Sequence, residues 1–152
     1  MDITLFNTLG RQKQVFTPIT PGKVGLYTCG PTVYDYQHIG NFRTFMFEDL
    51  LKRVLLYNGY DVTHIMNITD VGHLVSDGDE GEDKIGRMGK LEQLEPMEIV
   101  QRYSNDFHSV LNLFNLKSPS IEPTATGHLV EQIEATQALI GKGLAYESNG
   151  SV

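Results

Sequence analysis

The chain has 152 residues, 40% hydrophobic and 20% charged, which is the length and composition of about one globular domain with a core of its own. The formal net charge of -7 excludes a broadly basic nucleic-acid surface, so any such contact must be local or lie elsewhere. A single cysteine excludes an internal disulfide framework, and no apolar run approaches the roughly 20 residues that cross a membrane. The first residues lack the pattern of a signal peptide, so the expected location is the cytoplasm.

The N-terminal part of the chain predicts a β-hairpin and then a strand. Residues 2–6 and 13–17 are short β-prone runs on either side of a turn sequence, and we assign the hairpin to residues 1–20. Residues 24–29 predict a buried strand, because they form a short, mostly apolar run that ends at the glycine-proline pair beginning with Gly30.

A helix and a second strand follow. Apolar residues recur at helical spacing from about residue 40 to residue 57, and Gly59 suits the left-handed position that ends such a helix. Residues 61–68 are rich in β-branched side chains and predict the next strand. A strand, a helix and a strand in this order predict a right-handed unit with parallel strands, which bind ligands at their carboxyl ends. Cys29 and Thr69 lie at these ends, so we expect the segments that carry them to meet in space.

The remainder of the chain predicts mostly helices. Residues 72–83 are acidic and rich in glycine, which predicts a solvated surface loop. An EF-hand calcium site does not fit this loop, because a glycine occupies its fifth position and no helix–loop–helix pattern surrounds it. Helices are predicted over residues 83–94, 96–114 and 126–140, with a proline-containing connector over 117–123. Residues 145–147 have the pattern of the start of a strand.

The stretch from residue 27 to residue 41 concentrates groups that carry chemistry. It contains the only cysteine, Cys29, a glycine-proline turn, a histidine, His38, and the expected start of a helix. A helix start offers unpaired N–H groups and a positive dipole end to a phosphate, and the histidine can donate to developing negative charge. A thiolate can bind a soft metal. The structural alternatives are a small buried cysteine, a helix cap at His38 and Asn41, and a second capping pair at Thr69 and Asp70.

This stretch closely resembles the first-half catalytic motif of the cysteinyl-tRNA synthetases, a family of class I aminoacyl-tRNA synthetases. Residues 38–41, His-Ile-Gly-Asn, are similar to the HIGH tetrapeptide of that class, with asparagine in the last position. Residues 6–19, 67–71 and 127–146 resemble further segments of the family, so the resemblance covers nearly the whole chain. It implies an α/β fold with a Rossmann-like parallel sheet.

The resemblance also implies a division of the chain and a reaction. Residues 21–117 would form the first half of the catalytic domain, and residues 118–152 would begin a helical connective insertion. The reaction would activate L-cysteine with ATP and Mg²⁺ to cysteinyl-adenylate and pass the cysteinyl group to tRNA(Cys).

Specific residues take roles in this resemblance. The catalytic residues would be His38 and Asn41, and the ATP-binding residues would be Pro31, Thr32, His38, Gly40 and Asn41. Gly30 and Thr69 would bind the substrate cysteine. Cys29 would be one of four zinc ligands, and the zinc would take the thiolate of the substrate, which selects cysteine over serine.

The chain departs from the family in what it lacks. The other three zinc ligands and the lysine-rich KMSKS-like loop are missing from it, so we expect it to be a fragment that is inactive, or nearly so, and binds zinc weakly or not at all. An incomplete sheet exposes a strand edge, so some self-association is also expected. Two alternatives remain open: a ligase that joins cysteine to a small amine, as in the mycothiol pathway, and a non-catalytic nucleotide-binding half-domain.

Overall fold

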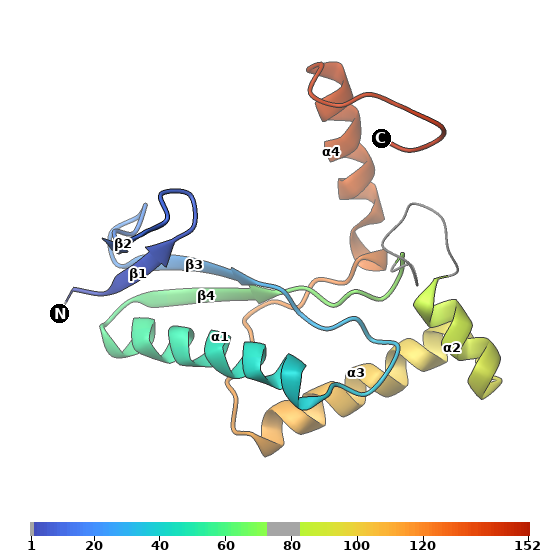
Figure 1. Cartoon of the computed structure of the whole chain (residues 1–152), viewed down its shortest axis with the longest axis horizontal. Coiled ribbons are helices and arrows are strands. Elements are labelled where there is room, and N and C mark those ends of the chain that lie inside the picture. Colours follow the sequence, from blue (N-terminus) through green and yellow to red (C-terminus); the bar gives the residue numbers. More distant parts are fainter. Residues whose placement is uncertain (1, 73–82) are drawn as a thin grey trace.

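The structure, a computed structural model, describes residues 2–72 and 83–152. The predicted acidic loop therefore lies almost wholly outside the described residues. The N-terminal hairpin is confirmed: β1 (Thr4–Asn7) pairs antiparallel with β2 (Gln12–Val15). Figure 1 shows this hairpin at one end of the molecule, beside β3.

The predicted strand–helix–strand unit is also confirmed. β3 (Lys23–Thr28) and β4 (Asp61–Met66) pair in parallel, and α1 (Ile39–Tyr57) connects them. α1 ends at a turn in which Gly59 has a φ of 84°, the left-handed conformation that the sequence predicts. Figure 1 shows α1 running along one face of the two strands.

The predicted burial of the strand at residues 24–29 is wrong for most of its residues. Only Val24 and Thr28 of this strand are buried, and the other side chains are exposed or half-buried. Successive side chains of a strand point to opposite faces of the sheet, and in β3 the buried residues are two that share a face. An apolar run can therefore predict the strand without predicting that both its faces are covered.

Two further helices confirm the predicted positions. α2 (Lys84–Glu92) is followed by α3 (Pro96–Leu113), with Pro96 in the first turn, where its missing N–H has no intrahelical partner to lose. The side chains that α3 buries share one face of the helix: Ile99, Val100, Tyr103, Phe107 and Leu111. Aromatic rings join α3 to α1, with Phe45 and Phe107 in edge contact at 5.1 Å between ring centroids. The main core cluster thus lies between the sheet, α1, α2 and α3.

The predicted connector after α3 is more than a connector. Its residues run parallel to β4, with the pairs Ile65–Ile121 and Ile68–Thr124. Backbone bonds support the pairing, among them Met66 N to Ile121 O at 3.1 Å and Ile68 N to Pro123 O at 2.9 Å. β4 is therefore flanked by β3 on one side and by this segment on the other. The sequence analysis missed this pairing because prolines argue against a strand. A proline is nevertheless tolerated at the edge of a sheet, where only its carbonyl oxygen must form a hydrogen bond.

Charged side chains of α1 hold the turn that leads into this segment. Lys52 is buried and donates to Ser118 O at 2.6 Å, and burial lowers the pKa of its ammonium. Asp49 accepts from Lys117 N at 2.9 Å and from Arg53 Nε at 2.5 Å. The half-buried ion pair and these backbone bonds fix the path of residues 115–118 and so place the segment against β4.

The C-terminal part stands away from the rest. A short 3-10 turn, Thr126–His128, leads into α4 (Leu129–Gly141), close to the predicted helix. None of the residues of α4 is buried, and Figure 1 shows the helix projecting from the sheet. Residues 145–147 do not form the predicted strand. Among the described residues no strand lies beside them to supply the ladder that a strand needs.

Candidate functional site

The two strand ends meet, as the topology predicts. Beyond the last ladder pair, Thr69 N donates to Pro31 O at 2.9 Å, and Val33 N donates to Thr69 O at 3.2 Å. Thr32 and Thr69 form an isolated parallel bridge. The segment after Cys29 and the segment that contains Thr69 therefore lie side by side, although about 40 residues separate them in the sequence.

Gly30 makes this approach possible. A Cβ atom on Gly30 would lie 1.8 Å from the carbonyl oxygen of Asn67, far inside van der Waals contact. The backbone of Gly30 also donates to the side-chain oxygen of Asn67 at 3.2 Å. Only glycine fits this position without separating the strand ends.

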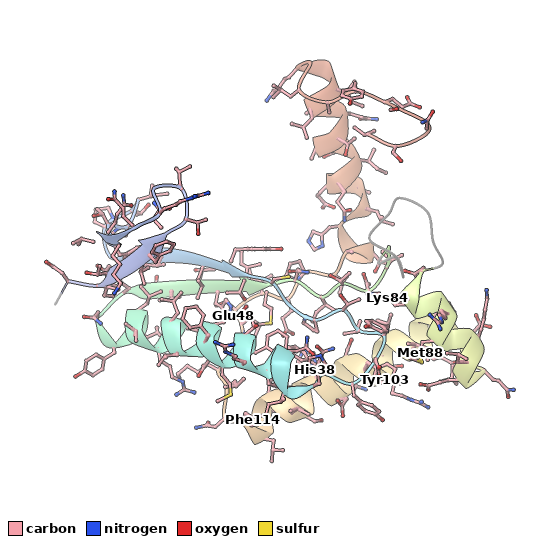
Figure 2. The ribbon with its side chains drawn as sticks, viewed as in Figure 1. His38, Glu48, Lys84, Met88, Tyr103 and Phe114 are labelled. Atoms are coloured by element: carbon pink, nitrogen blue, oxygen red, sulfur yellow. The ribbon has the colours of Figure 1, made fainter. Side chains whose placement is uncertain are left out.

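His38 caps the start of α1 with its own ring. Its Nδ1 accepts from Gly40 N at 3.0 Å, and its backbone N–H donates to Asn41 Oδ1 at 3.1 Å. Because Nδ1 accepts, the ring proton lies on Nε2, which is then the atom that can donate to a ligand. A Cβ on Gly40 would lie 2.7 Å from the His38 ring, so glycine is needed for this capping conformation. Figure 2 shows His38 at the end of α1 that faces α3.

The capping changes one expectation from the sequence. A helix start was expected to offer unpaired N–H groups to a phosphate, but the backbone N–H of Gly40 donates to the His38 ring, and the backbone N–H of Asn41 donates to His38 O at 2.9 Å. The donors left at this helix start are the backbone N–H of Ile39, Nε2 of His38 and the side-chain amide nitrogen of Asn41, whose oxygen already accepts from the His38 backbone.

A polar cavity of about 270 Å³ opens beside this helix start. Predicted site residues that line it are Gly30, Pro31, Thr32, His38 and Asn41, together with Tyr34, Asp35, Tyr36, Gln37 and Phe45. Cys29, Gly40 and Thr69 are not among the lining residues: the backbone of Thr69 bonds to Pro31 and Val33 beside the cavity, and Cys29 is exposed before the turn. The structure thus gathers most of the predicted ATP-binding residues around one cavity, while their roles stay a prediction.

The outer wall of the cavity rests on α3. The ring of Tyr36 packs edge-on against Tyr103, with ring centroids 5.0 Å apart. The hydroxyl of Tyr103 donates to Glu92 at 2.5 Å, and burial together with this carboxylate raises the pKa of Tyr103 to about 12. Tyr103 therefore stays protonated and has a structural role: through Tyr36 it supports the loop between β3 and α1.

Cys29 is a possible metal ligand, but the structure shows no other metal-ligating side chains grouped with it among the described residues. It is exposed, and its Sγ lies 3.8 Å from Gly30 O. Across the described part of the chain, no three His, Cys, Asp or Glu side chains come together in a way that could hold a metal ion. The residues in hand therefore supply one soft ligand and do not by themselves fit a four-coordinate zinc site.

A buried polar cluster lies directly under the end of β3, and the sequence analysis missed it. The Thr28 hydroxyl lies 2.9 Å from His64 Nε2, and Glu48 of α1 is buried beside them, with Thr28 as its hydrogen-bonding neighbour. Burial raises the pKa of Glu48, and burial together with Lys52 lowers the pKa of His64. Alternation along the two strands places residues 28 and 64 on one face, but sequence alone does not say that α1 covers that face with a carboxylate.

Asp70 has a definite structural partner. It is buried and accepts hydrogen bonds from the backbone N–H of Thr126, at 3.0 Å, and from the Thr126 hydroxyl. This contact ties the end of β4 to the turn that precedes α4. Asp70 therefore has a structural role that only the fold reveals, because its partner is 56 residues away in the sequence.

Comparisons with known proteins place this geometry in a family. The family model described as "tRNA synthetases class I (C) catalytic domain" matches residues 15–152. The chain belongs to this family. Curated relatives named Cysteine--tRNA ligase include those of Phocaeicola vulgatus, 52% identical over 150 residues, Thermus thermophilus, 49% over 152 residues, and Deinococcus radiodurans, 51% over 151 residues. These matches cover 99–100% of this chain but only 30–32% of the relatives, so the chain spans about a third of their length.

A solved structure supports the fold. The ternary complex of LeuRS, tRNA and LeuAMS from Agrobacterium radiobacter K84 superimposes with a TM-score of 0.62 over 86% of this chain and 16% of that chain, at 23% identity. The class I synthetase catalytic domain, with mixed α/β content and a parallel sheet, is thus the architecture of this chain. Within residues 2–72 and 83–152, no helix combines the length and the apolar character that crossing a bilayer requires.

Proposed function

We propose that this chain supplies the first part of the active site of a cysteine–tRNA ligase, which activates L-cysteine with ATP and Mg²⁺ and transfers it to tRNA(Cys). The observation that carries the proposal is the junction of the two strand ends, where Thr69 N and Pro31 O bond at 2.9 Å beside the cavity at His38. Relatives named Cysteine--tRNA ligase, which match this chain over its whole length, support the proposal. They also favour the synthetase over a ligase that acts on a small amine.

The first step would be attack by the cysteine carboxylate on the α-phosphorus of ATP. A new oxygen–phosphorus bond forms, the bond from the α-phosphorus to the oxygen that bridges to the β-phosphate breaks, and pyrophosphate leaves with that oxygen. Such a step needs alignment and charge stabilisation more than covalent help. In this chain, Nε2 of His38 and the amide nitrogen of Asn41 would donate to phosphate oxygens.

The loop from Pro31 to Gln37 would form the wall against which the nucleotide lies. Gln37 braces this loop with bonds from its side-chain nitrogen to Thr32 O at 3.4 Å and to Asp35 O at 3.3 Å. Tyr36 rests on α3. A braced wall keeps reacting groups aligned, which is where a large part of such a rate enhancement originates.

For a zinc ion, this chain would supply a single ligand. Cys29 would be the one ligand from this part of the protein, and the metal, when bound, would select a thiol-bearing amino acid over its hydroxyl analogue. Because one ligand does not hold the ion, we expect the 152-residue chain to be inactive or nearly so without the rest of a synthetase. We also propose that the parallel sheet is the first half of a Rossmann-like fold and that the protein acts in the cytoplasm.

The domain division is part of this proposal. Residues 120–125 pair with β4, so we place the boundary between the catalytic sheet and the connective insertion after residue 125 instead of at residue 117. α4, with no buried residue, would then be the first element of the insertion.

The test has two measurements. The first is ATP binding to the 152-residue chain, followed by backbone amide chemical shifts, which should change in the loop around Thr32. His38→Ala should weaken ATP binding, whereas the matched variant His128→Ala should not. Cysteine-dependent ATP–pyrophosphate exchange should be absent from this chain, with or without zinc, and present in a protein of the relatives' length that carries it. Exchange by the 152-residue chain would refute the expectation of inactivity. An unchanged ATP affinity in His38→Ala would refute the proposed site.

A further inference from the structure

The side chain of Asn67 connects the two halves of the proposed cysteine-binding site. Its Oδ1 accepts from Gly30 N at 3.2 Å and from the Tyr27 hydroxyl at 3.1 Å, and its Nδ2 donates to Thr69 Oγ1 at 3.1 Å. Gly30 and Thr69 stand on different strand ends, and Asn67 bonds to both. No role for this residue follows from the sequence pattern alone.

The hydrogen bonds fix which way the amide of Asn67 points. A backbone N–H can only donate, so the group that faces Gly30 must be the oxygen, and the amide nitrogen must face Thr69. The Thr69 oxygen then accepts from Asn67, and its own proton is left to donate elsewhere. Asn67 thereby makes the Thr69 hydroxyl a donor toward an acceptor atom of a ligand.

Asn67 also takes the place of sheet pairing that has ended. The ladder between β3 and β4 stops at the pair Thr28–Met66, and Gly30 lies beyond it. The bond from Gly30 to the Asn67 side chain joins the residue after Cys29 to the end of β4, in addition to the backbone bonds between Thr69 and residues 31 and 33, at a backbone separation that leaves no room for a Cβ. The position of Cys29 relative to Thr69 therefore depends in part on the side chain of Asn67.

We propose that Asn67 is a positioning residue for substrate cysteine: its oxygen holds the Cys29–Gly30 turn against β4, and its amide nitrogen sets the Thr69 hydroxyl to donate. This inference rests on the proposed function, because only cysteine activation gives both strand ends the same ligand. The two roles belong to different atoms of one side chain, so a variant that keeps one atom and changes the other separates them.

Asn67→Asp is that variant. Aspartate keeps an oxygen for Gly30 but has no hydrogen to give Thr69, so the Thr69 proton turns inward to the carboxylate. Asn67→Ala removes both interactions. On the 152-residue chain, hydrogen exchange at the Gly30 amide should accelerate about tenfold in Asn67→Ala, as loss of one hydrogen bond implies, and stay near the wild-type rate in Asn67→Asp. Asn105→Ala, at an exposed position on α3, is the control for general destabilisation.

Equal exchange at Gly30 in the wild type and Asn67→Ala would overturn the clamping role. An equal acceleration in Asn105→Ala would do the same, because the effect would then be global. This measurement needs neither zinc nor activity, so it decides the geometry whether or not the proposed function holds.

The second measurement is the KM for cysteine in ATP–pyrophosphate exchange, in a protein of the relatives' length that carries this sequence. Asn67→Asp should raise it about tenfold, as should Thr69→Val, while the KM for ATP stays constant, and the double variant should be no worse than either single one. Additive effects, or a rise in both KM values, would overturn the role in setting Thr69. A wild-type protein without cysteine-dependent exchange would instead overturn the proposed function itself.

Discussion

Replacing Gly30 with alanine should separate the two strand ends. The new Cβ would start 1.8 Å from Asn67 O, so one strand end must withdraw by more than about 1 Å before the contact becomes tolerable. Three hydrogen bonds span that gap: Gly30 N to Asn67 Oδ1, Thr69 N to Pro31 O, and Val33 N to Thr69 O. At about 1 kcal/mol for each bond, their loss should cost about 3 kcal/mol of the free energy of unfolding.

Gly25 provides the matched control for this experiment. It lies on β3, the strand that precedes Gly30, and a Cβ there would meet nothing within 4 Å. Gly25→Ala should therefore be neutral, or stabilise the chain by about 0.4–1 kcal/mol through the unfolded state. Urea unfolding followed by circular dichroism suits the comparison, because the chain has no tryptophan. If Gly30→Ala and Gly25→Ala unfold within about 0.5 kcal/mol of each other, the close approach is not a constraint on the fold and the reasoning fails.

Three further predictions concern the surroundings of the site. Burial raises the pKa of Glu48, so its contribution to stability is present below pH 4.5 and is lost as the pH rises through the raised pKa. The free energy of unfolding of Glu48→Gln should therefore increase relative to that of the wild type across this pH range. Parallel profiles of unfolding free energy against pH for the two proteins would contradict this. Asp70→Ala should cost about 1–3 kcal/mol and speed proteolytic cleavage near Thr126, with exposed Asp61→Ala as the control; equal cleavage of both variants would show that the contact does not hold α4. The chain alone should self-associate in sedimentation experiments, because apolar side chains of α1 and α4 are exposed, and a strict monomer at high concentration would count against this.

Local patterns were enough to predict the elements that lie near the site. The spacing of apolar residues predicted α1, α2 and α3 to within a few residues, and the order of strand and helix predicted parallel pairing of β3 with β4. Those patterns state which residues share a face, but they do not state what covers the face. The exposed side of β3 and the pairing of the proline-containing segment with β4 both depend on tertiary contacts, so the sequence analysis missed them.

The candidate site divides in the same way. His38, Asn41 and the turn at Gly30 are close in sequence, so a short motif was enough to predict them together. Asn67 bonds to Gly30 and Asp70 bonds to Thr126, which are 37 and 56 residues distant, so these two contacts follow only from the fold. A residue whose role is to hold another residue leaves little trace in a single sequence, because its type is set by geometry and not by reaction chemistry.

The end of the β3–β4 ladder explains why the site is built from side chains that bond to backbone. Sheet pairing fixes the two strands as far as Thr28 and Met66, and the turn after Cys29 must then leave the sheet to begin α1. Backbone groups there lose their ladder partners, and a buried group without a partner is costly. Asn67 supplies one replacement, and His38 supplies another at the start of the helix. The same residues that satisfy the orphaned groups also define where a ligand can lie, so in this chain local stability and the shape of the proposed site depend on one set of hydrogen bonds.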